Sequence, residues 1–301
     1  MKPAPFTLHA PSALDEALDI LAECGEDGKV LAGGQSLIPM LNMRLASPAQ
    51  LVDINGVPGL DRVEPSPEGV RIGALARHAQ VARDAGAAAR VPLLAQALAL
   101  VAHPVIRNRG TTVGSLAHAD PSGEMTAVLS LLGGSMELVR KGGSRTVAAQ
   151  DFFLGPLESC LEPGELALSA WFPALPVRSG TAFREISRRH GDYAVCGVAA
   201  AVTLDDGGGV ASATTSYISM TATPVVLDLT DAVVGQPWDS ADWAAAASLA
   251  ADRLDPEPDI HATAAYRRHL SVVLTRQALT AAAQAALAAT ESPTVTPGGA
   301  R

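Results

Sequence analysis

Residues 31–39 read Leu-Ala-Gly-Gly-Gln-Ser-Leu-Ile-Pro, and this is the most informative stretch of the 301-residue chain. A short buried strand is expected to end at Ala32, where two glycines interrupt the apolar run. The residues from Ser36 to Leu45 then suit a helix, since the proline of the stretch falls in the first turn, where proline is tolerated. A second short strand is expected at Leu51–Ile54. The local order is therefore strand, glycine loop, helix and strand.

The glycine pair makes this loop a candidate binding site for an anion. Because neither glycine carries a side chain, backbone N–H groups can approach a phosphate, and the start of the following helix adds partial positive charge. The serine would add a hydroxyl donor, and the glutamine would donate a hydrogen bond or cap the helix. The same residues also suit a plain tight turn, and they match neither G-x-G-x-x-G nor the P-loop pattern. The candidate residues of this loop are Ala32, Gly33, Gly34, Gln35, Ser36 and Leu37.

Sequence patterns around this loop predict further helices and strands. A first helix is expected where Leu14, Leu18 and Leu21 fall on one face, after the capping residue Ser12. A second lobe is expected after residue 56. Its predicted elements are strands at 69–75, 136–139 and 145–147, and helices near residue 80, at 92–101 and at 124–132, with an apolar stretch at 166–172.

The segment from His103 to Gly123 shows no periodicity and is expected to be a long loop with a binding role. Its residues 107–121 read Arg-Asn-Arg-Gly-Thr-Thr-Val-Gly-Ser-Leu-Ala-His-Ala-Asp-Pro. Cations, glycines and hydroxyls in such quick succession are partners for phosphate and ribose. A structural loop whose arginines form salt bridges would have the same composition. His103 and His118, each taken alone, are more often structural than catalytic.

Prolines at 173 and 176 mark a boundary before a C-terminal segment with a different pattern. Tyr193–Leu204 and Val210–Ile218 are typical of two strands that form a hairpin through an Asp/Gly-rich turn. Helices are expected at 241–254 and 263–288. The remaining residues are rich in Pro, Gly and Thr, which predicts disorder.

Composition excludes several classes of function. The net charge of −9 argues against nucleic acid, because phosphate polymers require a dense basic surface. Cys24, Cys160 and Cys196 form no C-x-x-C pair, so the sequence predicts no metal site, and three unpaired thiols fit a reducing compartment. No segment has the apolar length of a signal peptide or a membrane span. We therefore expect no membrane span and a cytoplasmic location.

Four motifs, taken together and in order, resemble one protein family. They are Leu31–Pro39, His103–Gly110, Ser115–Pro121 and Ser187–Ala194, and Tyr266–Leu270 extends the likeness toward the C-terminus. The chain is similar to the FAD-binding medium subunit of molybdenum hydroxylases, of the carbon monoxide dehydrogenase and xanthine dehydrogenase type. The resemblance runs from about Phe6 to the helix near Arg276.

The resemblance implies an α+β fold in which FAD lies between two lobes. A PCMH-type FAD-binding domain would span 1–175, with lobes at about 1–56 and 57–175. A smaller C-terminal domain of antiparallel sheet packed with helices would span 176–288, and 289–301 would be a disordered tail.

The resemblance also implies which residues contact FAD. The backbone of Ala32–Leu37 would hold the diphosphate. The second loop and the regions near the nucleoside and flavin ring would add Thr111, Gly114, Ser115, His118, Asp120, Glu124, Leu166, Ala167, Arg184 and Tyr193. Among these, Asp120 and Glu124 correspond to the ribose and adenosine side, whereas Arg184 and Tyr193 correspond to the flavin ring.

One position departs from the family pattern. Aligned without gaps, the family's Thr-[Ile/Val]-Gly-Gly corresponds to Thr111-Thr112-Val113-Gly114, so that Val113 replaces a glycine. A β-branched residue with positive φ would be strained by roughly 1 to 2 kcal/mol. The alternative is that the loop is shifted by one residue.

The implied function is that of an oxidoreductase subunit without an acid–base triad of its own. An iron–sulfur small subunit and a molybdopterin-binding large subunit would be its partners, and FAD would deliver electrons from the clusters to an external acceptor. A stand-alone FAD oxidase is an alternative, although Gln35 stands near the place where many such oxidases carry a flavin-linked histidine. A scaffold that has lost FAD is a second alternative, suggested by Val113.

Overall fold

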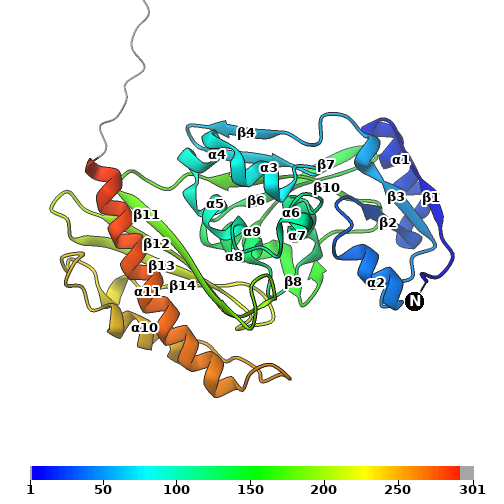
Figure 1. The fold of residues 1–301 in the computed structure, drawn as a ribbon. Coiled ribbons are helices and arrows are strands. Elements are labelled where there is room, and N and C mark those ends of the chain that lie inside the picture. The colour runs from blue at the N-terminus through cyan, green and yellow to red at the C-terminus, as the bar shows by residue number, and fades with distance from the viewer. Residues whose placement is uncertain (1, 292–301) are drawn as a thin grey trace, which may run out of the picture.

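The first lobe is built on a three-stranded parallel sheet. The computed structural model describes residues 2–291, and Figure 1 shows this lobe at one end of the molecule. Its strands are β1 (Thr7–His9), β2 (Gly28–Leu31) and β3 (Gln50–Asp53), in the order β1-β3-β2, and its helices are α1 (Leu14–Cys24) and α2 (Leu37–Met43). The apolar face of α1 packs Leu18 and Leu21 against Val52 and Ile54. The predicted order of strand, glycine loop, helix and strand is confirmed.

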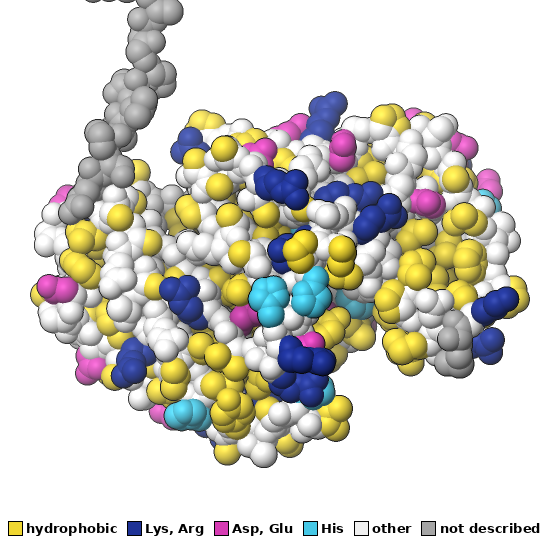
Figure 2. Space-filling view, viewed as in Figure 1, with side chains coloured by type: hydrophobic (Ala, Val, Ile, Leu, Met, Phe, Trp, Pro, Cys, Tyr) yellow, Lys and Arg dark blue, Asp and Glu magenta, His cyan; other side chains and the backbone are white. Residues whose placement is uncertain are grey.

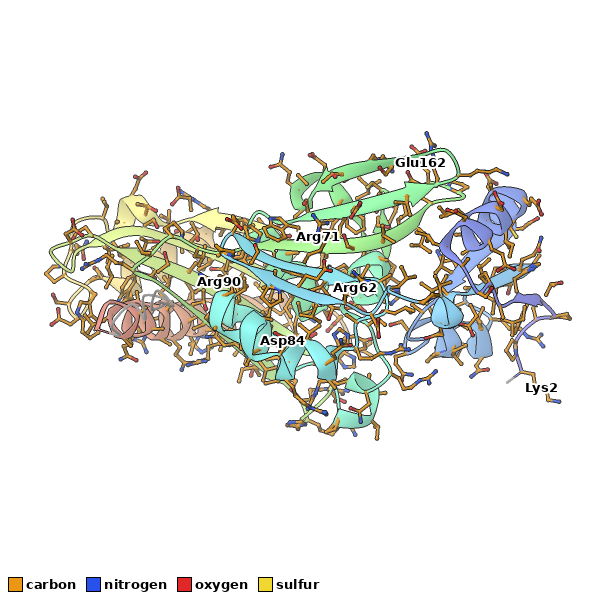
Figure 3. All side chains as sticks on the ribbon, turned by 90° about the horizontal axis from the view of Figure 1, so that it is seen from above. Lys2, Arg62, Arg71, Asp84, Arg90 and Glu162 are labelled. Atoms are coloured by element: carbon orange, nitrogen blue, oxygen red, sulfur yellow. The ribbon has the colours of Figure 1, made fainter. Side chains whose placement is uncertain are left out.

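The second lobe is a five-stranded antiparallel sheet in the order β4-β5-β10-β6-β7. Its strands are β4 (Val63–Ser66), β5 (Gly69–Gly73), β6 (Ser135–Arg140), β7 (Gly143–Ala148) and β10 (Leu166–Pro173), beside a small hairpin of β8 (Phe153–Gly155) and β9 (Glu158–Ser159). Its helices are α3 (His78–Arg83), α4 (Ala85–Arg90), α5 (Pro92–Leu98), α6 (Pro104–Arg107), α7 (Thr112–His118), α8 (Glu124–Leu131) and α9 (Ala149–Phe152). In Figure 3, Arg71 lies among the strands, and Asp84 and Arg90 mark α4 on one side of them.

The expected irregular loop from His103 to Gly123 contains two short helices, α6 and α7. Pro104 begins α6, and the Thr111 side chain caps α7 by accepting a hydrogen bond from Gly114 N at 3.1 Å. Neither helix is longer than seven residues, which is too short for a helical period to be seen in the sequence. The prediction of an unstructured connection was therefore wrong.

The C-terminal part is a four-stranded antiparallel sheet covered on one face by two helices. The strands are β11 (Ser179–Ser187), β12 (Ala194–Leu204), β13 (Val210–Ile218) and β14 (Val225–Asp228), paired in that order, and the helices are α10 (Trp243–Asp252) and α11 (Ala264–Glu291). The predicted hairpin is confirmed as β12–β13. Single 3-10 turns at Gly25–Asp27, Ile54–Gly56 and Thr230–Ala232 complete the structure. Helix α11 continues through three residues of the predicted tail, and the rest of that tail lies outside the described residues.

The other face of the C-terminal sheet shares its core with the second lobe. Phe183 of β11, Ala199 of β12 and Ile218 of β13 belong to the same buried cluster as Leu94 of α5 and Val128 of α8. Side chains alternate across a strand, so β11 directs Phe183 to the second lobe and its neighbour Ala182 to the helices. The α+β fold is confirmed. Within residues 2–291, none of the helices combines the length and apolar character needed to cross a bilayer.

Candidate functional site

The glycine loop after β2 presents a row of free backbone donors. Across residues 2–291, the N–H groups of residues 33–37 donate no hydrogen bond to any other part of the protein, and the first amide bonded locally is that of Ile38, to Gly34 O at 3.0 Å. Gly34 has φ of 74°, a left-handed conformation that favours glycine. Unpaired buried or half-buried amides require a partner, and an anion satisfies several of them at once.

The second glycine-containing segment packs directly against this loop. A Cβ on Gly33 would lie 2.6 Å from Arg109 O, 2.8 Å from Gly110 Cα and 3.0 Å from Thr111 N. Residue 33 must therefore be glycine for the two backbones to approach this closely. The predicted juxtaposition of the two loops is present, and Figure 2 shows a notch on this side of the molecule between the first lobe and the remainder.

Two residues outside both motifs tie these loops together. Asn55 Nδ2 donates to Ala32 O at 2.8 Å, and Arg77 Nη2 donates to Asn55 Oδ1 at 2.6 Å. Arg77 Nη1 donates in turn to Arg109 O at 2.6 Å. Neither residue was predicted from the sequence. Asn55 lies just after Asp53, the last residue of β3, and Arg77 lies just before His78, the first residue of α3. Neither position belongs to a sequence motif that indicates a binding role.

Helix α7 explains the departure at Val113. This valine lies in the first turn of a right-handed helix, so the strain expected for a positive φ is absent, and its side chain is 1 % exposed in the core of the second lobe. A Cβ on Gly114 would collide with Thr111 Oγ1, which caps the helix. The glycine that matters for this loop is therefore Gly114.

Two other hydrophilic residues of α7, Ser115 and His118, share one environment. Ser115 and His118 are half-buried, and among residues 2–291 neither side chain forms a hydrogen bond with another. Burial lowers the pKa of His118, and the Lys29 ammonium lowers it further, against the opposing effect of Asp120. At neutral pH this imidazole is uncharged and offers one donor and one acceptor.

Carboxyl groups gather where α7 leads into α8. Burial, followed by the Glu185 and Asp120 carboxylates, raises the pKa of Glu124 to about 8. Burial raises the pKa of Glu185 on β11 to about 7, and its Oε2 is buried without a hydrogen-bond partner within the described chain. Tyr193 is 68 % exposed as a residue, and partial burial, followed by the Asp120 carboxylate, raises the pKa of its phenol. Protonated carboxyls can donate as well as accept, which suits the hydroxyls of a ribose or ribitol.

The segment 110–124 connects all three parts of the molecule. Its start touches Gly33 of the first lobe. Its end is fixed to the C-terminal part, where the N–H of Ser219, the residue that follows β13, donates to Pro121 O at 2.8 Å. The Ser219 hydroxyl lies 2.8 Å from the hydroxyl of Ser122 and donates to Ala194 O at 2.6 Å. A ligand held along this segment would extend from the free amides of the first lobe to the carboxyl cluster.

Three predicted residues do not join this arrangement through their side chains. Leu166 begins β10 and is 1 % exposed in the core beneath α1, so that only its backbone can face a ligand, and Ala167 is half-buried beside it. Arg184 lies on the face of β11 opposite to Glu185, in a shallow hollow of about 560 Å³ with Trp243 and Arg276. The described chain has no group of three or more His, Cys, Asp or Glu side chains that could hold a metal ion.

Comparisons with known proteins agree with this geometry. The family described as "FAD binding domain in molybdopterin dehydrogenase" matches residues 4–175, and that described as "CO dehydrogenase flavoprotein C-terminal domain" matches 181–282. The chain is 39 % identical to the 6-hydroxypseudooxynicotine dehydrogenase complex subunit alpha of Paenarthrobacter nicotinovorans, over 97 % of this chain and 99 % of that one. It is 34 % identical to the carbon monoxide dehydrogenase medium chain of Afipia carboxidovorans, over 93 % and 97 %.

A solved structure shows the same fold. Quinoline 2-oxidoreductase from Pseudomonas putida 86 contains a chain with a TM-score of 0.88 and 35 % identity, covering 95 % of this chain and 100 % of that one. Together these findings define the protein as a flavin-binding oxidoreductase subunit. It belongs to the family of FAD-binding medium subunits of molybdenum hydroxylases, and its cofactor is FAD.

Proposed function

We propose that this chain carries electrons from iron–sulfur clusters on a partner chain, through FAD, to an external acceptor. The observation that carries the proposal is the row of free N–H groups at residues 33–37, packed against the backbone of residues 109–111. A diphosphate linking two nucleosides supplies the acceptors that these amides need. With three cysteines in all, the chain cannot ligate a cluster that needs four cysteine thiolates, so the electrons must come from another subunit.

The residues of this chain bind and orient the cofactor. When bound, FAD supplies the redox chemistry, since it accepts single electrons and delivers pairs. We propose that Ala32–Leu37 with Thr111, Gly114 and Ser115 hold the diphosphate side, and that Asp120 and Glu124 meet the nucleoside hydroxyls. Tyr193, which is exposed next to Asp120, would lie at the flavin ring. His118 would donate or accept a hydrogen bond beside the diphosphate.

The cofactor proposal is tested on the purified full-length chain. We expect flavin absorption bands with a stoichiometric amount of FAD, released into solution by acid. Flavin that stays attached after acid denaturation would favour the stand-alone oxidase, whereas a chain that takes up no FAD on incubation would favour the scaffold. The side chain at position 35 is glutamine, whose Nε2 donates to Gly33 O at 3.3 Å, and it offers no imidazole for a covalent link.

The electron-transfer proposal is tested on the complex. We propose an iron–sulfur small subunit and a molybdopterin-binding large subunit as partners, so purification from the native source should recover both with this chain. In a complex stripped of FAD, substrate should still reduce the clusters, but reduction of the external acceptor should stop until FAD is restored. A single chain that oxidises substrate unaided would contradict the proposal.

The cellular location is a further part of the proposal. Cys24, Cys160 and Cys196 are all free in the structure, and this is typical of proteins in a reducing compartment. We therefore place the complex in the cytoplasm. Fractionation of native cells followed by detection of this chain would test the placement.

A further inference from the structure

The hydrogen-bond chain through Asn55 and Arg77 lies behind the contact between the two loops. Asn55 sits in the 3-10 turn after β3, and Arg77 precedes α3, so that each belongs to a different lobe. The chain runs from Ala32 O to Asn55, from Asn55 to Arg77, and from Arg77 to Arg109 O, with distances of 2.8, 2.6 and 2.6 Å. It therefore links the carbonyl before Gly33 to the carbonyl that Gly33 packs against.

Fixing these carbonyls determines where neighbouring amides point. In a planar trans peptide, the C=O of one residue and the N–H of the next point in opposite directions. The bond from Asn55 Nδ2 to Ala32 O therefore aims the Gly33 N–H away from Asn55, which makes it the first of the free donors at residues 33–37. The bond from Arg77 to Arg109 O holds the opposing backbone at its short distance from Gly33.

The hydrogen bonds of the Arg77 guanidinium go to neutral oxygens. Among residues 2–291 its guanidinium forms no salt bridge, because its N–H groups donate to the neutral oxygens of Asn55 and Arg109. The nearby Asp53 carboxylate instead accepts from Asn55 N at 3.0 Å and from Asn55 Nδ2 at 2.6 Å. Burial, followed by the Arg109 guanidinium, lowers the pKa of Arg77, against the opposing effect of the Asp53 and Asp61 carboxylates. Arg77 forms no ion pair with these carboxylates, so its half-buried guanidinium also adds positive charge at the junction of the two loops.

We propose that Asn55 and Arg77 are positioning residues for FAD, which hold the two glycine-containing loops at the separation and amide orientation that the diphosphate requires. This inference rests on the proposed function, in which the loops bind the FAD diphosphate. The bonds join carbonyls of the two loops and do not pair strands, so the pair acts on the contact between the loops.

The test is the rate of FAD release from the full-length chain, followed by the rise in flavin fluorescence after dilution. We expect Arg77→Gln and Asn55→Ala each to release FAD about 10- to 100-fold faster, as for loss of a hydrogen bond to a charged group. The double variant should lose less than the product of the two single effects, since both residues belong to one hydrogen-bond chain. The matched control is Arg71→Gln. Arg71 bridges strands through Glu137 and Ser169 at 3.0 and 2.9 Å and forms no hydrogen bond to either loop, so its loss should leave FAD release unchanged.

Three outcomes would overturn the inference while leaving FAD binding intact. The first is an Arg77→Gln chain that keeps FAD like the wild type, and the second is an Arg71→Gln chain that loses FAD as fast. The third is an Arg77→Lys chain that keeps FAD as long as the wild type does. Lysine keeps the positive charge but lacks the planar guanidinium, so this result would show that Arg77 acts through its charge alone. Circular dichroism of the FAD-free chains checks that each variant folds. If Arg77→Gln does not fold, the rates of FAD release from Asn55→Ala and Arg77→Lys decide the question. A wild-type chain that never binds FAD would overturn the proposed function and this inference together.

Discussion

Replacing Gly33 with alanine should separate the two loops without unfolding the protein. The added Cβ would meet only backbone atoms, namely Arg109 O at 2.6 Å, Gly110 Cα at 2.8 Å and Thr111 N at 3.0 Å. Ordinary carbon contacts lie at about 3.5–4.0 Å, so one loop must move by roughly 0.5 to 1 Å. Overpacking of this size typically costs about 1–3 kcal/mol. If that cost falls on the bound state, affinity for FAD should drop about 10- to 100-fold.

The assay compares this variant with a second glycine that is equally crowded but distant from the loops. Gly134 also lacks a positive φ, and a Cβ there would lie 2.5 Å from Trp171 O and 2.5 Å from Leu129 Cδ1. Gly134→Ala should lower the melting temperature of the FAD-free chain at least as much as Gly33→Ala. The dissociation constant for FAD, measured by fluorescence titration, should change only in Gly33→Ala.

Two results would refute this reasoning. Unchanged FAD affinity in Gly33→Ala would show that the contact between the loops has no part in binding. An equal loss of affinity in Gly134→Ala would show that any destabilisation of this domain releases FAD. In either case the free amides at residues 33–37 would need a different partner.

Further predictions concern stability. The folded-state pKa values of Glu124 and Glu185, about 8 and 7, lie above the ordinary 4.5, so the folded state holds protons that the unfolded state has lost. The free energy of unfolding of the FAD-free chain should therefore fall as pH rises from 5 to 8, by on the order of 1–3 kcal/mol for each carboxyl after allowance for partial exposure. In the double variant Glu124→Gln plus Glu185→Gln, the free energy of unfolding from denaturant titrations should depend less on pH. An unchanged dependence on pH would contradict its assignment to these two carboxyls. Arg267 is 6 % exposed and donates to Val195 O, Ser219 O and Asp259. Arg267→Met should therefore lower the free energy of unfolding by about 3–5 kcal/mol in the same titration. A decrease below about 1 kcal/mol would mean that these bonds contribute little. Gly180 lies against the backbone of Ala282 and Ala286, so Gly180→Val should displace α11 and lower the melting temperature, whereas Gly142→Val, in an open turn, should cost only its backbone strain.

Elements of the fold could be predicted where the pattern of apolar residues was long or where glycines interrupted it. The strand, glycine loop and helix around residues 31–39 and the hairpin of β12 and β13 were expected and are present. β4 and β14 are four-residue edge strands, and β11 begins in a polar stretch, so none shows enough alternation to be recognised. α6 and α7 were missed because one or two turns carry no measurable period.

The candidate site could be predicted only as far as local residues define it. The two loops were identified from glycines and hydroxyls, and their contact at Gly33 agrees with that expectation. Asn55 and Arg77 act through side-chain bonds to carbonyls of distant residues, which no local motif can indicate. Side chains alternate along a strand, so Arg184 and Glu185 lie on opposite faces of β11. Which of these faces meets the site depends on the packing of the sheet against α8, and the sequence does not indicate this packing.

The core shared by α5, α8 and β11–β13 bears on how the chain can be divided. The two matched families meet between residues 175 and 181, yet Phe183, Ala199 and Ile218 are buried in one cluster with Leu94 and Val128. Cutting the chain at this linker would leave an apolar face exposed on each fragment, and both would be prone to aggregate. The boundary between the two families in the sequence is therefore not a boundary between two independently stable proteins.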